Sequence, residues 1–189
     1  MSLSKPSDDG LFRQALRNYA RLLKERPVLT KACTSAAAGA LGSIVSQLLT
    51  LRGQPGSSMN YKNVAAYALA GFLWVGPSVH HFHAWLERTF PKSLENSALR
   101  KLMTDRIFFC PTFLFVYIYM LTIFEGLGSE AAYEKLKLGY WPALLINWKF
   151  WTPLQYINVK YIPQQYRVPF MSIMGFLWTV YIAWKTRPK

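Results

Sequence analysis

Four stretches without a Lys, Arg, Asp or Glu dominate the pattern of hydrophobic and polar positions along this chain. They are residues 32–51, 63–86, 107–124 and 168–184. An α-helix needs about 20 apolar residues to cross the hydrocarbon core of a bilayer, so each stretch has roughly the length of one crossing. The pattern predicts an all-α fold, a polytopic membrane helix bundle with about four transmembrane helices and amphipathic surface helices.

A fifth apolar stretch, residues 138–159, is interrupted by Lys149 and by two prolines. Proline removes a backbone donor and bends a helix, so this stretch is predicted to be a kinked, membrane-embedded segment rather than a simple span. The residues that follow, up to Val168, are rich in Tyr and Gln. Tyr and Trp collect at membrane–water interfaces, which favours a segment that lies at a bilayer surface or dips from it.

Proline and glycine also mark bends and links. The predicted helix kinks are at Gly76, Pro77, Pro153 and Pro163. Residues 87–106 are polar and are predicted to be a link with a short surface helix. Residues 125–138 are predicted to form a second short amphipathic surface helix.

The N-terminal part of the chain is amphipathic and basic. From Leu11 to Glu25 apolar residues recur on one helical face and basic residues on another, namely Arg13, Arg17, Arg21 and Lys24. Such a helix lies on a membrane or binds a receptor, and it also resembles a mitochondrial presequence. The chain is therefore predicted to divide into a cytosolic N-terminal segment, residues 1–31, and a membrane domain, residues 32–189.

Small residues recur every four positions in the first span. In lipid, where no hydrophobic force drives helices together, such rows let helix backbones approach closely. The alternative is the ordinary small-residue composition of a membrane helix. The predicted helix-packing positions are Ser35, Gly39, Gly42 and Ser43.

The net charge of the chain is +13, which suits nucleic acid or a membrane with anionic lipids as a partner. The basic residues lie mainly between apolar runs and not on one polar face, so a membrane is favoured and no nucleic acid is expected. With four spans, alternate assignment of the links places 15 Lys and Arg on one side and 7 on the other. The positive-inside rule then predicts that both termini are cytosolic.

No motif for catalysis is present: there is no GxSxG, no Gly-rich phosphate loop, no HExxH and no paired CxxC. An enzyme is therefore not expected, and neither is a cofactor. His80, His83 and Glu87 have helical spacing and share a face, but no fourth ligand is near in sequence to complete a metal site. The favoured interpretation is a polar stripe that faces a water-filled path between helices.

Polar residues within apolar stretches are the candidates to line such a path. The neutral candidates are Gln47, His80, His83, Asn147, Gln155 and Asn158, whose amides and imidazoles can replace hydrogen bonds that a solute loses to water. Arg106, Lys149 and Arg167 would favour anions. The alternatives are an interhelical hydrogen bond for each amide and a lipid-phosphate anchor for Arg167.

Several spaced motifs are specific. They are Trp151-Thr152-Pro153-Leu154-Gln155 with Asn158, Ile162-Pro163, Tyr166-Arg167-Val168, Gly76-Pro77 with His80, and Asp105-Arg106 with Pro111. From about Leu11 to Trp184 the chain resembles a family of small eukaryotic organelle membrane proteins with peroxisomal and mitochondrial inner-membrane members. Arg26–Lys31 and Trp141–Leu144 are most similar to the peroxisomal type.

The resemblance implies a pore for small solutes in the peroxisomal membrane. It also implies delivery by a cytosolic import receptor for peroxisomal membrane proteins, which would bind the basic N-terminal segment. Membrane lipids and further copies of the chain are the other expected partners. Two alternatives stay open: a mitochondrial inner-membrane channel of the same family, and a non-conducting membrane scaffold.

Overall fold

The computed structural model describes residues 8–51 and 58–185, and that part of the chain is helical and contains no strand. The elements are α1 (Asp8–Glu25), α2 (Pro27–Leu51), α3 (Tyr61–Ala70), the π-helical turn η1 (Gly71–Val75), α4 (Gly76–Thr89), α5 (Ser97–Thr104), the π-helical turn η2 (Asp105–Phe109), α6 (Cys110–Phe124), α7 (Gly128–Tyr161), the 3₁₀ turn η3 (Gln164–Tyr166) and α8 (Arg167–Lys185). The predicted all-α fold is confirmed.

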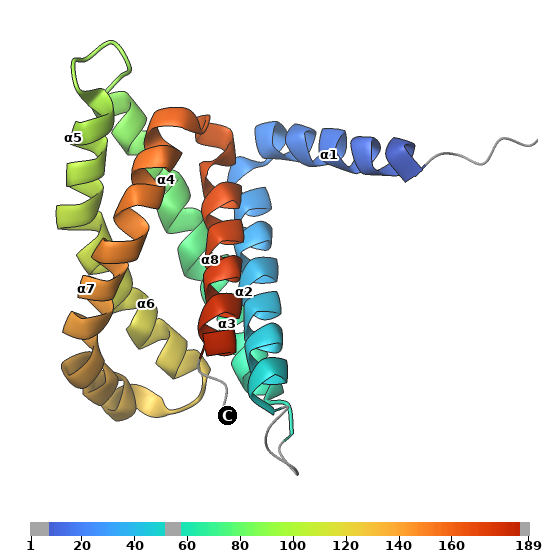
Figure 1. Cartoon of the computed structure of the whole chain (residues 1–189), viewed down its shortest axis with the longest axis vertical. Coiled ribbons are helices and arrows are strands. Elements are labelled where there is room, and N and C mark those ends of the chain that lie inside the picture. Colours follow the sequence, from blue (N-terminus) through green and yellow to red (C-terminus); the bar gives the residue numbers. More distant parts are fainter. Residues whose placement is uncertain (1–7, 52–57, 186–189) are drawn as a thin grey trace, which may run out of the picture.

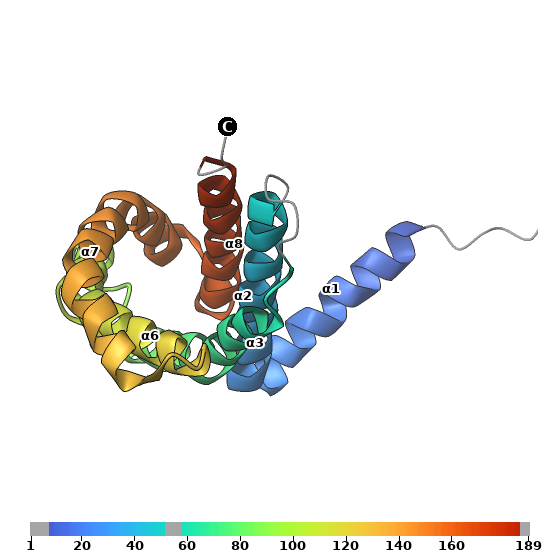
Figure 2. The same ribbon diagram turned by 90° about the horizontal axis from the view of Figure 1, so that it is seen from below.

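The helices join into rods that run back and forth between two ends of the bundle (Figure 1). α3, η1 and α4 form one continuous rod, and α5, η2 and α6 form another. α2 is central, because it packs against α8 on one side and against the α3–η1–α4 rod on the other. α6 packs against α3 and α7, so that the rods form an arc when viewed along the bundle (Figure 2).

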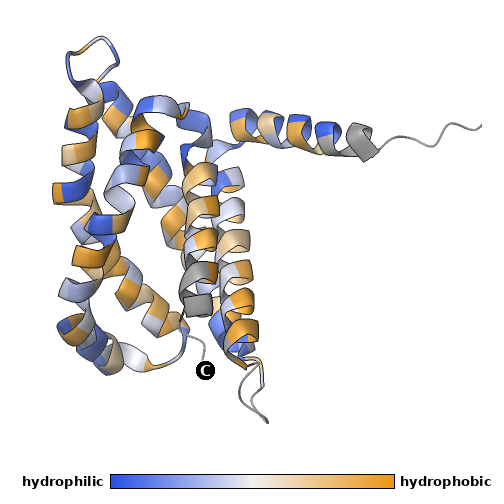
Figure 3. Cartoon of the chain, in the orientation of Figure 1, coloured by the Kyte–Doolittle hydropathy of each residue, from blue (hydrophilic) through white to orange (hydrophobic). Residues whose placement is uncertain are grey.

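The outer surface of the bundle is strongly apolar. Two described helical segments, Pro27–Leu49 and Ser97–Phe124, are long and apolar enough to cross a membrane. Large apolar side chains such as Phe108, Leu41 and Leu177 point outward, and apolar residues spread over the rods (Figure 3). An exterior of this kind suits contact with lipid.

The boundaries of several predicted elements are wrong. α2 begins at Pro27, so Lys31 lies inside the first rod and is buried. Residues 97–106 are helical and continue into α6. Residues 125–138 do not form a separate surface helix, because α7 starts at Gly128 and runs without a break through the 138–159 segment. α7 is curved in Figure 2, and both of its internal prolines are accommodated within it.

The continuity of α7 changes the expected topology. α2, the α3–η1–α4 rod, the α5–η2–α6 rod, α7 and α8 alternate in direction, which gives five crossings of the bundle and not four. α1 and the start of α2 therefore lie at one end, called here the α1 end, and the last described turn of α8 lies at the other (Figure 1). The prediction that both termini share one side depended on four crossings, and a count of five does not favour it, so the side of each terminus stays a prediction.

The predicted kinks have different structural roles. Pro153 lies inside α7, whereas Pro163 lies in the link before η3 and bends no helix. Gly76 and Pro77 open α4 directly after η1, in a rod that stays helical. Gly76 allows close contact, because a Cβ on it would meet the backbone of Ala32 in α2.

The small residues of α2 lie against the neighbouring rod. A Cβ on Gly39 would stand 2.7 Å from the Tyr67 carbonyl oxygen, and one on Gly71 would stand 2.5 Å from the Ser35 carbonyl oxygen. Ser43 donates to Asn63 Oδ1 at 2.6 Å. These contacts are within one copy of the chain, and they bring the two rods to backbone contact over three turns.

Candidate functional site

A cavity of about 320 Å³ lies among α2, the α3–η1–α4 rod, η2, α6, α7 and α8. Most of its wall is apolar and aromatic, including Val75, Val79, Phe109, Phe113, Met171 and Phe176. Polar side chains line the rest, including Ser35, His83, Asp105, Arg106, Asn147, Gln155 and Ser172. A volume of this order is typical of small-molecule sites.

Both π-helical turns contribute to this cavity. In each turn a backbone N–H reaches the carbonyl five residues earlier, from Gly76 to Gly71 and from Cys110 to Asp105. Turns of this type are rare and occur often at functional sites, because the extra residue redirects the side chains around it. Here η2 places Asp105, Arg106 and Phe109 on the cavity wall.

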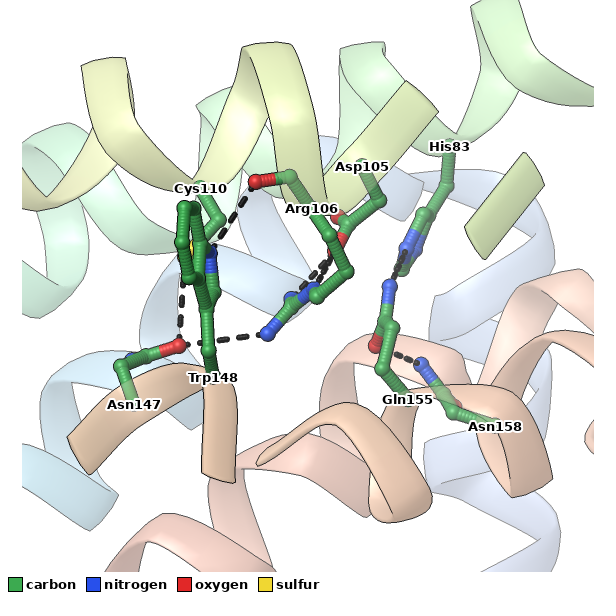
Figure 4. A network of polar contacts seen from close by, with 8 residues as sticks. All are labelled: His83, Asp105, Arg106, Cys110, Asn147, Trp148, Gln155 and Asn158. Carbon is green, nitrogen blue, oxygen red and sulfur yellow. Dashed lines mark hydrogen bonds and ion pairs between the residues drawn. The ribbon is translucent and has the colours of Figure 1, made fainter. Parts of the chain in front are cut away.

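Arg106 is the centre of the first polar network (Figure 4). Its guanidinium pairs with the buried carboxylate of Asp105 and donates to Asn147 Oδ1 of α7 at 3.2 Å. The Asn147 oxygen also accepts from Cys110 Sγ at 3.2 Å, and the Trp148 indole donates to the Arg106 carbonyl at 3.1 Å. The network ties η2 to α7 and leaves the Asp105–Arg106 pair without net charge.

The second network connects α4 with α7. The Asn158 amide donates to Gln155 Oε1 at 3.2 Å, which orients the Gln155 amide so that its nitrogen faces His83 Nε2 at 3.2 Å (Figure 4). His83 then accepts at Nε2 and carries its proton on Nδ1. His83 Nδ1 has no hydrogen-bond partner among the described residues, and His83 borders the cavity.

Polar and charged side chains that are buried or half-buried gather at the α1 end, in a group called here the Glu87 cluster: Glu87, Lys101, Arg167, Lys31 and His80. Glu87 Oε1 lies 2.8 Å from Lys101 Nζ and 2.6 Å from Arg167 Nη1. Arg167 also donates to the carbonyls of Ile162 and Val159, where α7 ends. Lys31 Nζ donates to His80 Nδ1 at 3.0 Å. The cluster joins α2, α4, α5, α7 and α8 at one level.

The structure separates the predicted path-lining residues into two sets. His83, Arg106, Asn147 and Gln155 line the cavity, from three different rods. The others lie elsewhere: Gln47, His80, Lys149, Asn158 and Arg167. Gln47 accepts from the Asn60 backbone N–H at 2.6 Å and holds the start of α3, while Lys149 is exposed on the outside of α7.

Four residues of the two sites were not among the predicted site residues. They are Asp105, Lys31, Glu87 and Lys101. Asp105 carried a usable signal, since a carboxylate next to an arginine at the edge of an uncharged run is expected to pair. Glu87 also had a signal, its helical spacing with His80 and His83, which predicts a polar stripe between helices. Lys31 and Lys101 lie in regions that the apolar pattern assigns to water, and no spacing in the sequence indicates that they are buried.

The chain is similar to known membrane proteins along almost its whole length. It is 39% identical to peroxisomal membrane protein 2 of Bos taurus over 176 residues, which cover 92% of this chain and 90% of the relative. It is 32% identical to the mitochondrial inner membrane protein Mpv17 of Xenopus laevis, over 89% of this chain and 95% of the relative. It is 30% identical to PXMP2/4 family protein 3 of Dictyostelium discoideum, over 97% and 96%.

No solved structure matches the chain. The family model described as Mpv17 / PMP22 family matches residues 122–183, from the end of α6 through α7 to α8. This region supplies Asn147, Gln155 and Arg167 to the two sites described above. The match to this family model and the 39% identity to the bovine relative over 92% of the chain show that the chain belongs to the Mpv17 / PMP22 family.

Proposed function

We propose that this chain forms a channel-like path for small solutes across the peroxisomal membrane. The observation that carries the proposal is the cavity inside the bundle, with Asp105, Arg106, Asn147 and Gln155 on its wall. Ionisable and amide groups within a membrane bundle usually face a solute or ion pathway. The organelle follows from the similarity to peroxisomal membrane protein 2.

The polar wall suits passage better than tight binding or catalysis. Most of its polar groups already form hydrogen bonds with one another. A passing solute would therefore replace one of these hydrogen bonds for a short time, because few of the groups lack a partner. His83 Nδ1 is the exception: it is buried and has no hydrogen-bond partner among the described residues. The mainly aromatic wall would keep the path narrow and dry in the conformation described.

Chemical block of the cavity tests the proposal. In a background without the two native cysteines, Ser172→Cys places a thiol on the cavity wall, and Ile173→Cys places one on the exposed face of the next residue. A charged, water-soluble thiol reagent is expected to lower the single-channel conductance of the Ser172→Cys protein several-fold in a planar bilayer. The Ile173→Cys protein should conduct as before.

The two positions of α8 are adjacent, so general damage to the helix would affect both proteins alike. Labelling is confirmed by mass on the same sample. If fully labelled Ser172→Cys protein conducts normally, the solute path does not pass through this cavity. If purified parent protein shows no conductance at all, the non-conducting scaffold is the better description.

A preference for small anions is the finer part of the proposal. Arg106 and Arg167 are each paired with a carboxylate, and Lys149 lies outside, so these three side chains contribute less free charge than their number suggests. The remaining excess is at the α1 end, where Lys101 and Arg167 share one carboxylate and Lys31 contacts the imidazole of His80. A fixed excess of positive charge near a path raises the local concentration of anions.

Neutralising either member of the Asp105–Arg106 pair is expected to change ion preference in opposite directions. Asp105→Asn leaves the arginine uncompensated and should move the reversal potential toward anions, whereas Arg106→Gln should move it toward cations. The permeability ratio should change several-fold in asymmetric KCl, and less at high salt because of screening. Equal reversal potentials in both folded variants would remove this pair from the path.

The orientation and the partners complete the proposal. Basic residues of the described part gather at the α1 end, namely Arg88, Lys92, Arg100, Lys101, Lys160 and Arg167, and the positive-inside rule places that end in the cytosol. Arg13, Arg17, Arg21 and Lys24 are exposed there and would be available to the import receptor during delivery. Homo-oligomers are expected to form through the exposed apolar faces, since the α2 glycines Gly39 and Gly42 are used inside the bundle.

The mitochondrial inner membrane is the second candidate location, because Mpv17 of Xenopus laevis is also similar over nearly the whole chain. The conducting path would be the same in either membrane. Fluorescence imaging of the tagged chain against markers of both organelles distinguishes the two locations.

A further inference from the structure

The corner between α1 and α2 is fixed by specific contacts. Arg26 precedes a proline, a position where helical backbone is disfavoured, and the chain bends there. The Thr30 hydroxyl donates to the carbonyls of Leu22 at 3.0 Å and Arg26 at 2.8 Å. α1 therefore does not continue α2 into water but leads sideways from the bundle (Figures 1 and 2).

One face of α1 is turned toward the body of α2. Tyr19 Oη bonds to Thr34 Oγ1 at 2.9 Å, and Thr34 lies about two turns into α2. Leu23, one turn after Tyr19, is buried at 2% exposure. Leu16, about one turn before Tyr19 on the same face, is 52% exposed although it points to the same side.

The position of this face relative to the membrane follows from α2. Pro27–Leu49 is one of the two described segments fit to cross a bilayer, so the membrane surface lies near the corner. The face of α1 that is directed along α2 from that corner is therefore directed into the bilayer leaflet in which α2 begins. The exposed Leu16 then meets lipid and not water, which removes the cost of its exposure.

The adjoining face of α1, about a third of a turn around the helix, carries the charge. Arg13, Arg17, Arg21 and Lys24 are all exposed, and the single described acidic partner, Glu25, is 3.9 Å from Arg21. Long basic side chains at this depth reach headgroup phosphates beside the helix while the apolar face stays in the acyl boundary. Each such residue near an anionic surface adds to the electrostatic attraction of the helix to the membrane.

We infer that α1 is an interfacial helix that docks on the anionic headgroups of the leaflet where α2 begins. The surface it recognises is a bilayer with acidic phospholipid, held by Leu16 and Tyr19 on one side and by the basic row on the other. The inference concerns the folded, inserted protein and does not depend on the proposed channel. In this state the basic row is engaged by lipid.

Spin labels at neighbouring positions test the inference on the full chain. Leu16→Cys and Arg17→Cys, each in the background without native cysteines, are reconstituted in phosphatidylcholine alone or mixed with phosphatidylserine. In the mixed vesicles the accessibility ratio of oxygen over a water-soluble nickel chelate is expected to be several-fold higher at position 16 than at position 17. Phosphatidylcholine alone should reduce this difference.

Two results would overturn the inference. Equal access of the nickel chelate at both positions would mean that α1 stands in water, where its basic face is free for a protein partner. An equal difference in both lipid mixtures would mean that acidic headgroups are not recognised. As a control, Arg13→Gln with Arg21→Gln in the Leu16→Cys protein should lower the ratio in mixed vesicles several-fold and leave it unchanged in phosphatidylcholine.

Discussion

Replacement of Glu87 by glutamine is expected to lower the free energy of unfolding by about 3–5 kcal/mol, because removal of one partner strands a buried opposite charge. Glu87 is the carboxylate between Lys101 and Arg167, which are 2% and 1% exposed. Lys31, also buried, reaches only His80 among the described polar contacts. Without Glu87 the cluster would hold three cations and no anion.

The loss is measured as thermal unfolding of the purified protein in detergent, with tryptophan fluorescence as the signal. Glu134→Gln in α7 is the matched control, since Glu134 is exposed and a surface substitution of this kind stays within about 0.5 kcal/mol. Adding Lys101→Met to Glu87→Gln should recover part of the lost stability, because one stranded cation is then removed. A Glu87→Gln protein as stable as the parent would mean that the cluster is hydrated or already neutral.

The Glu87 cluster shows which contacts cannot be predicted from the sequence alone. Charged residues at the edges of apolar runs usually reach water, so the sequence pattern assigns Lys101 and Glu87 to a polar link. Their pairing depends on partners from α4, α5 and α8, which are brought together only by the order in which the rods pack. Pairing of distant charges is thus a tertiary property, whereas the adjacent pair Asp105–Arg106 is local and was within reach of prediction.

The apolar spans were predictable because helix formation in lipid depends on local composition. The continuity of α7 was not predicted from the sequence, because the two prolines were interpreted by their effect on helices in water. Pro142 and Pro153 interrupt a helix in water, but in lipid an unsatisfied carbonyl is so costly that the helix continues and bends around each proline. A continuous α7 also brings Asn147 and Gln155 to the same wall as Arg106 and His83.

The π-helical turns had no sequence signal that we can identify. η1 contains Gly71 and lies just before Gly76, and both glycines contact the α2 backbone, so close packing accounts for the glycines. It does not account for the extra residue in the turn. The candidate site was therefore only partly predictable: its amides and its arginine stand out as polar residues in apolar helices, but the register that gathers them depends on η2.

Gly76→Ala is expected to lower the free energy of unfolding by about 1–3 kcal/mol or more, because it inserts a methyl group where two backbones touch. The new Cβ would stand 2.7 Å from the Ala32 nitrogen and 3.0 Å from the Lys31 carbonyl carbon, and closer still to the Ala32 Cα. No side-chain rotation relieves contacts with backbone atoms. α2 and α4 must move apart, which also strains the hydrogen bond between Lys31 and His80.

Gly139→Ala in α7 provides the matched control for this substitution. A Cβ on Gly139 meets nothing within 4 Å, so alanine there should keep or raise stability, by up to about 1 kcal/mol from helix propensity. The two variants carry the same chemical change in a helix, and the difference between their melting temperatures in detergent isolates the α2–α4 contact. If both melt together, α4 is not packed against α2 at Gly76, and the Glu87 cluster that depends on this packing would have to be arranged differently.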